Sequence, residues 1–124
     1  MKKVLLIEDS ITVRQQVGFA IRQTGAQVMN AENGQIGLDL LARHVDDIGL
    51  IFLDLHMPVL SGMEALETIK YKREFSQIPV FILTTEGCQE MLDKARSLGA
   101  VGWITKPFLP ETIWEAIKRY LKSE

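Results

Sequence analysis

The sequence predicts an α/β fold in which helices cover both faces of one five-stranded parallel sheet. Five short apolar runs alternate along the chain with segments whose apolar residues recur at helical spacing. A strand–helix unit repeated five times implies parallel strands joined by right-handed crossovers, with helices on both sides of the sheet. The predicted strands are residues 3–7, 27–31, 49–53, 79–83 and 101–104.

The first two predicted helices follow the first two strands. Ser10 can cap the start of the first helix, and Gly25 stands where a glycine commonly follows a helix end. The second helix is predicted to begin at Asn33, with Ile36 and Leu40 on one face. The apolar pattern of the first helix consists of Val13, Val17, Ala20, Ile21 and Thr24.

Local end signals also mark the last three helices. Ser61 and Glu64 have the spacing of a capping box at the start of the third helix. The fourth helix is predicted to include Cys88 and to end at Gly99, and Pro110 suits the first position of the fifth. The apolar faces are Met63, Leu66 and Ile69; Met91, Leu92, Ala95 and Leu98; and Ile113, Ile117, Tyr120 and Leu121.

Length and composition predict a single globular domain over residues 1–124. The chain is 47% hydrophobic and 24% charged, as ordinary globular proteins are, and we expect no second domain, since the fifth helix ends near Leu121. The net charge of −2 gives no basic field for nucleic acid or an anionic membrane, and no apolar run reaches the ~18 residues of a membrane span. One cysteine fits a reducing compartment, so we expect a cytoplasmic protein, and nothing demands more than a monomer.

Polar residues follow four of the five predicted strands. Glu8 and Asp9 follow the first strand, Asp54 the third, Thr84 the fourth and Lys106 the fifth. Because parallel strands are buried on both faces, the first polar residue after each strand emerges at the carboxyl edge of the sheet. If the first strand is central and the third lies beside it, three carboxylates and one ammonium converge at the edge where such sheets bind ligands.

This set of side chains indicates phosphoryl chemistry assisted by a metal ion. Clustered carboxylates raise one another's pKa unless a cation neutralises them, and oxygen ligands of this kind suit Mg²⁺. Asp54 stands alone at its strand end, so it is the best candidate for a nucleophile toward phosphorus. Glu8 and Asp9 would hold the metal ion. Lys106 would pair with a phosphoryl oxygen, and Thr84 would offer a hydroxyl.

The chain resembles the receiver domains of two-component response regulators, most of all the stand-alone kind typified by chemotaxis regulators. The resemblance covers essentially the whole chain and implies the flavodoxin-like fold with strand order 2-1-3-4-5. Each motif alone is weak, and their order along the chain makes the match specific. The matching motifs are Glu8-Asp9, Asp54-Leu55-His56-Met57-Pro58 with Ser61-Gly62, Thr84-Thr85-Glu86 and Lys106-Pro107-Phe108.

The resemblance also implies a chemical role for several residues. Asp54 would accept a phosphoryl group from a histidine kinase or phosphotransfer protein with Mg²⁺, and the backbone carbonyl of His56 would be a further metal ligand. The peptide bond before Pro107 would be cis. The protein would be a phosphoacceptor that catalyses only its own phosphorylation and dephosphorylation.

Signalling would follow from a change of shape. By the same resemblance, Thr84 moves toward the phosphoryl group and Trp103 rotates inward behind it. This changes the surface of the fourth helix, fifth strand and fifth helix, either for regulated binding of an unknown protein partner or for phosphorelay. We further hypothesise that His56 and Glu86 set the lifetime of the phosphorylated state, because both are polar and would flank the phosphoryl group.

Three residues depart from the commonest pattern of the family. Glu8 stands where aspartate is usual, Thr85 where a smaller residue is usual, and Trp103 where tyrosine or phenylalanine is usual. None of these changes removes a required group, so they bear on rates rather than on the activity.

Three other functions fit parts of the sequence. A flavodoxin-like protein would bind FMN at the same edge, but the flavin phosphate would meet the negative charges of Glu8 and Asp9. A phosphatase with an aspartate nucleophile would usually carry an acid at the position of His56. A degenerate receiver that binds partners without phosphorylation is the third alternative.

Overall fold

The structure is a computed structural model that describes residues 2–57, 59–85 and 89–121. It confirms the predicted fold class: the five strands are parallel and lie in the order β2-β1-β3-β4-β5. The strands are β1 Lys3–Ile7, β2 Val28–Ala31, β3 Ile48–Asp54, β4 Val80–Thr84 and β5 Gly102–Thr105. The helices are α1 Ile11–Gln23, α2 Gly34–His44, α3 Gly62–Tyr71, α4 Gln89–Ser97 and α5 Pro110–Tyr120.

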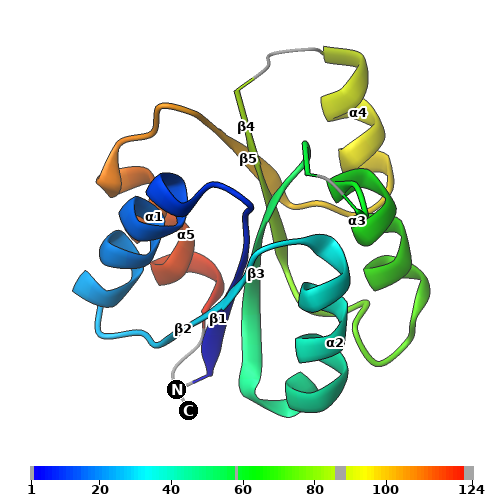
Figure 1. Cartoon of the computed structure of the whole chain (residues 1–124), viewed down its shortest axis with the longest axis horizontal. Helices are drawn as coiled ribbons and strands as arrows, with labels where there is room; N and C mark the ends of the chain where they lie inside the picture. The colour runs from blue at the N-terminus through cyan, green and yellow to red at the C-terminus, as the bar shows by residue number, and fades with distance from the viewer. Residues whose placement is uncertain (1, 58, 86–88, 122–124) are drawn as a thin grey trace.

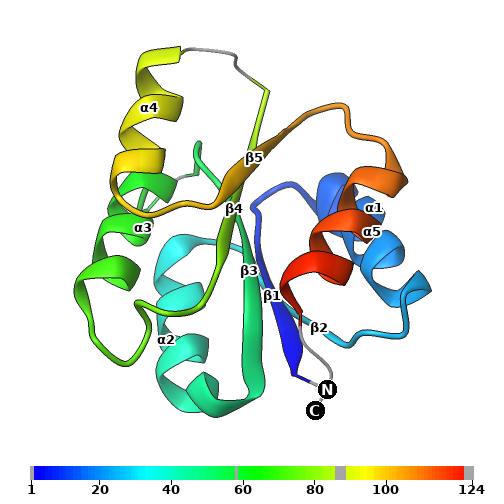
Figure 2. The same cartoon turned by 180° about the vertical axis from the view of Figure 1, so that it is seen from behind.

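Helices cover both faces of the sheet, which makes a three-layer arrangement. Figures 1 and 2 show α1 and α5 on one face, and α2, α3 and α4 on the other. Successive residues of a strand point to opposite faces, so β1 contributes Val4 and Leu6 to the core under α1 and α5. Leu5 and Ile7 of the same strand enter the core under the other three helices.

The residues predicted to begin and end the helices make the expected contacts. The Ser10 hydroxyl accepts a hydrogen bond from the backbone N–H of Val13 at 3.2 Å, and Ser61 and Glu64 form both halves of a capping box. Gly25 and Gly99 have positive φ angles of 89° and 109°, which glycine adopts at least cost at helix ends.

Differences from the predicted elements are small. Strands β2, β3, β4 and β5 begin or end one residue away from the predicted bounds, and a short 3-10 turn at Val45–Asp47 has no counterpart in the sequence pattern. Cys88, predicted in the fourth helix, lies outside the described residues. Across the part of the chain that the structure describes, no helix has the length and hydropathy needed to cross a membrane.

The strand register brings the ends of β1 and β3 to one level. Ile7 pairs with Leu53, so the next residues, Glu8 and Asp54, lie side by side at the carboxyl edge. At the other side of β3, the backbone N–H of Lys106 donates to the carbonyl of Thr84 at 2.8 Å, which joins the end of β5 to the end of β4. The ends of these four strands therefore lie at the same edge of the sheet.

Candidate functional site

Three carboxylates gather at the carboxyl edge of β1 and β3, as the sequence predicts. One carboxylate oxygen from each of Glu8, Asp9 and Asp54 lies within 4.8 Å of the others. Glu8 and Asp54 are buried, whereas Asp9 is exposed. Oxygen ligands of this type, with one side open to solvent, suit a hard cation that keeps part of its water shell.

Lys106 brings a positive charge to the same cluster from the far side of β4. Its Nζ lies 2.7 Å from Glu8 Oε1 and 3.4 Å from Asp54 Oδ1. The lysine is therefore shared between the two buried carboxylates, and it lies nearer to Glu8. A single ammonium cannot neutralise three ionised carboxylates, so the cluster carries an excess of negative charge when all three are ionised.

The environment of Glu8 fits an additional cation. Burial raises the pKa of Glu8 to about 7, although Lys106 and the backbone N–H of Ser10 oppose the rise and the charge of Asp54 adds to it. Oε2 accepts a hydrogen bond from Ser10 N–H at 3.1 Å. Oε1 is buried and, among the described residues, has the Lys106 contact but no hydrogen bond of good geometry. A buried carboxylate with spare acceptor capacity is what a metal ligand requires before the ion binds.

Asp54 is buried at the end of β3. Burial raises its pKa, and the charge of Lys106 is the largest opposing influence. Oδ1 accepts a hydrogen bond from the backbone N–H of His56 at 3.3 Å, which orients the carboxylate toward the cluster. Gly62 makes this loop possible, because a Cβ atom at that position would overlap the carbonyl oxygen of Asp54.

The other predicted site residues belong to β4, to β5 and to the loop after β3. Thr84 is buried at the end of β4, and the His56 side chain is exposed just beyond Asp54. Trp103 lies in register with Ile82, two residues before the end of β4, and its ring lies 4.9 Å from the guanidinium carbon of Arg96.

Two further expectations concern the neighbouring loops. The peptide bond between Lys106 and Pro107 is cis, as the resemblance implied. Glu86, proposed to tune the lifetime, lies outside the described residues, as does Pro58 of the third-strand motif.

Sequence reasoning missed Arg14. Its guanidinium Nη1 donates a hydrogen bond to the carbonyl oxygen of Glu8 at 2.8 Å and contacts that of Asp9 at 3.5 Å. The sequence shows only an arginine in the second turn of a helix, a position where most arginines are solvated, so no pattern singles it out.

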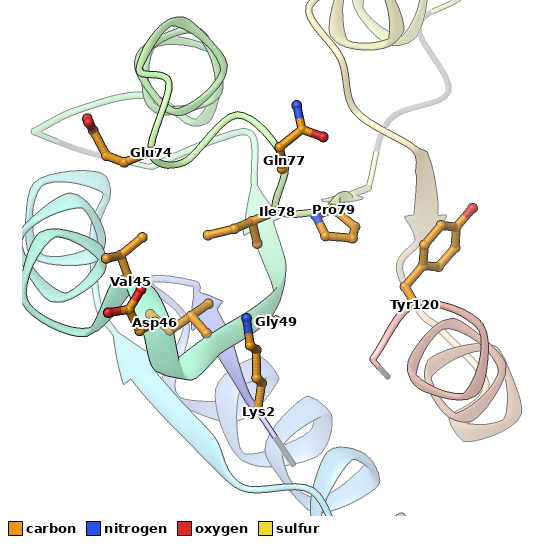
Figure 3. A pocket seen from close by; sticks show the side chains of 10 residues that line it. Lys2, Val45, Asp46, Gly49, Glu74, Gln77, Ile78, Pro79 and Tyr120 are labelled. Carbon is orange, nitrogen blue, oxygen red and sulfur yellow. The ribbon is translucent and has the colours of Figure 1, made fainter. Parts of the chain in front are cut away.

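A cavity lies at the opposite edge of the sheet. It measures about 380 Å³ and is lined by residues at the amino ends of β3 and β4 and at the end of α5, among them Ile48, Pro79 and Tyr120 (Figure 3). None of the clustered carboxylates lines it. The cavity is therefore separate from the candidate site.

Known proteins resemble this chain in sequence over nearly its whole length. A chemotaxis protein CheY homolog of Campylobacter jejuni is 28% identical over 120 residues, which cover 96% of this chain and 92% of that protein. Sporulation initiation phosphotransferase F of Bacillus subtilis is 32% identical over 120 residues, which cover 97% of this chain and 94% of that protein.

Solved structures and a family model agree with these relatives. The chemotaxis protein CheY4 of Vibrio cholerae superimposes with a TM-score of 0.88 at 32% identity, covering 97% of this chain and 98% of that one. A model of the response regulator receiver domain matches residues 4–118. The chain belongs to the response regulator receiver domain family, whose members carry phosphorylation-based signals in two-component systems.

Proposed function

We propose that this protein is a phosphorylation-activated switch in which Asp54 accepts a phosphoryl group from the phosphohistidine of an upstream histidine kinase or phosphotransfer protein. The observation that carries the proposal is the position of Asp54, buried beside Glu8 with the Lys106 ammonium shared between the two carboxylates. This arrangement supplies the nucleophile and a counter-charge before the donor arrives.

The proposed transfer uses side chains gathered at the carboxyl edge of the sheet. An Asp54 oxygen bonds to phosphorus while the P–N bond of the phosphohistidine donor breaks. The electron pair of the P–N bond stays on the donor's imidazole, which takes up a proton. Lys106 pairs with a phosphoryl oxygen, and the Thr84 hydroxyl donates to another. Glu8, Asp9, Asp54 and the backbone carbonyl of His56 would hold Mg²⁺, which when bound neutralises charge on the phosphoryl oxygens.

The proposed output is regulated binding of a protein partner. Thr84 and Trp103 would change position on phosphorylation and so alter the surface formed by α4, β5 and α5. A ligand shifts such an equilibrium only through contacts that differ between the two states, and the hydrogen bond from Thr84 to the phosphoryl group is one. His56 and Glu86 would set how fast water removes the phosphoryl group, and alanine at each position tests this.

Residues 1–124 would form one receiver domain that acts as a monomer in the cytoplasm. It is a phosphoacceptor whose only catalysis is its own phosphorylation and dephosphorylation. Membership of the receiver family favours this function over the flavin-binding and phosphatase alternatives.

Phosphorylation by a small donor tests the proposal directly. The protein is incubated with acetyl phosphate, with and without Mg²⁺, and its intact mass is recorded. We expect a Mg²⁺-dependent gain of one phosphoryl group that Asp54→Asn abolishes. Asp46→Asn, which changes an exposed aspartate at the opposite edge of the sheet, is the matched control and keeps the gain. An unmodified wild-type protein would instead indicate a degenerate receiver that binds partners without phosphorylation.

A further inference from the structure

We propose that Arg14 is a positioning residue that fixes the direction of the acidic pair Glu8-Asp9 and thereby sets the affinity of the site for Mg²⁺. The inference rests on the function proposed above and assigns a role to a residue outside the motifs of the cluster. Arg14 lies in α1, and its side chain extends back past the start of the helix to the loop that follows β1.

The two carbonyls that Arg14 contacts lie on either side of one Cα atom. The Glu8 carbonyl, 2.8 Å from Nη1, belongs to the peptide unit before the Cα of Asp9. The Asp9 carbonyl, 3.5 Å from the same nitrogen, belongs to the peptide unit after it. A guanidinium that holds both units restricts the two backbone dihedral angles of Asp9, and these angles determine where its side chain points.

Asp9 depends on this restraint more than Glu8 does. The Glu8 side chain is held directly, because Oε2 accepts the Ser10 N–H and Oε1 contacts Lys106. The Asp9 side chain is exposed, and the side-chain contact described for its carboxylate is with Asp54, a second acid that repels it when both are ionised. Its place in the cluster therefore follows from its backbone.

The identity of the residue fits this role. Arginine stays charged at every physiological pH and presents several N–H donors in a rigid fork, whereas lysine offers one mobile ammonium. Arg14 also lines two shallow surface hollows of about 230 and 300 Å³ beside α1. Because its head group borders open space, replacing it leaves the core intact, and the variants are expected to fold.

Groups that orient metal ligands commonly change metal affinity by roughly ten- to a hundredfold when they are removed. We therefore expect Arg14→Gln to weaken Mg²⁺ binding by about tenfold, measured by calorimetric titration of the unphosphorylated protein. Arg14→Lys keeps the charge but not the fork of N–H donors, so its Mg²⁺ affinity is expected to lie between those of Arg14→Gln and the wild type. Phosphorylation of Arg14→Gln by acetyl phosphate should be slow at low Mg²⁺ and approach the wild-type rate at saturating Mg²⁺.

Arg22→Gln is the matched control. It removes the same charge from the same helix, where the Arg22 guanidinium lies over Gly18. Equal Mg²⁺ affinity in Arg14→Gln, Arg22→Gln and the wild type would overturn the inference while leaving the proposed function intact. Tighter binding in Arg22→Gln than in Arg14→Gln supports it. A wild-type protein that takes no phosphoryl group would overturn the proposed function and this inference with it.

Discussion

The buried carboxyl group of Glu8 makes the stability of the cation-free protein depend on pH. Burial raises its pKa from the ordinary value of 4.5 to about 7, so between these values the folded state binds a proton that the unfolded state releases. Unfolding then releases a proton, and the free energy of unfolding falls as the pH rises from about 4.5 to about 7. The raised pKa of Asp54 acts in the same direction.

The size of the effect follows from the pKa difference. From 4.5 to about 7 is a difference of about 2.5, and each pKa unit corresponds to ~1.4 kcal/mol, which gives roughly 3 kcal/mol for Glu8. Glu8 is fully buried, so solvent screening removes little of this value. Domains of this size are commonly stable by about 5–15 kcal/mol, so the loss is a measurable fraction of the total.

Urea unfolding in the presence of a chelator measures this dependence at several pH values between about 5 and 8. Glu8→Gln cannot ionise, so we expect it to remove most of the decline seen in the wild type. Glu67→Gln, which changes an exposed carboxyl group on α3, is the control and keeps the decline. A decline in Glu8→Gln as steep as that of the wild type would refute the assignment of the raised pKa to this residue.

Three substitutions probe other parts of the site and its support, with urea unfolding and phosphorylation by acetyl phosphate as the measurements. Lys106→Met leaves Glu8 and Asp54 without a counter-charge, so it should slow phosphorylation strongly and steepen the pH-dependent loss of stability. Gly62→Ala should destabilise the protein and impair phosphorylation, because the added Cβ overlaps the Asp54 carbonyl. Ser61→Ala removes the capping box of α3, should cost about 1 kcal/mol, and should leave phosphorylation at saturating Mg²⁺ unchanged.

The sequence was sufficient to predict the fold and most of the carboxyl-edge cluster. Buried parallel strands are nearly continuous apolar runs, so the end of each run marks where a side chain reaches the edge of the sheet. Asp54 illustrates this point: it follows the run Ile51-Phe52-Leu53, and the structure has it as the last residue of β3. The helix caps were equally predictable, because Ser10 and Ser61 act within one turn of their own position.

Contacts between distant segments could not be predicted in the same way. The distances from Lys106 to Glu8 and Asp54 depend on how β5 lies beside β4 and on the direction of the loop after it. The contact of Arg14 depends on the direction in which α1 leaves the loop after β1. Neither contact leaves a periodic pattern in the sequence, because each involves a single side chain whose partner is brought near only by the three-dimensional fold.

The distances from the Lys106 ammonium to Glu8 and Asp54 bear on the role of Glu8. Its carboxylate holds the Lys106 ammonium at 2.7 Å, whereas Asp54 lies 3.4 Å from the same nitrogen. In the proposed transfer, Lys106 would have to weaken its contact with Glu8 in order to pair with a phosphoryl group on Asp54. That cost is smallest when the charge of Glu8 is neutralised by another partner. Through this contact the charge state of Glu8 would affect the availability of Lys106, so we expect the rate of phosphorylation to be sensitive to both residues together.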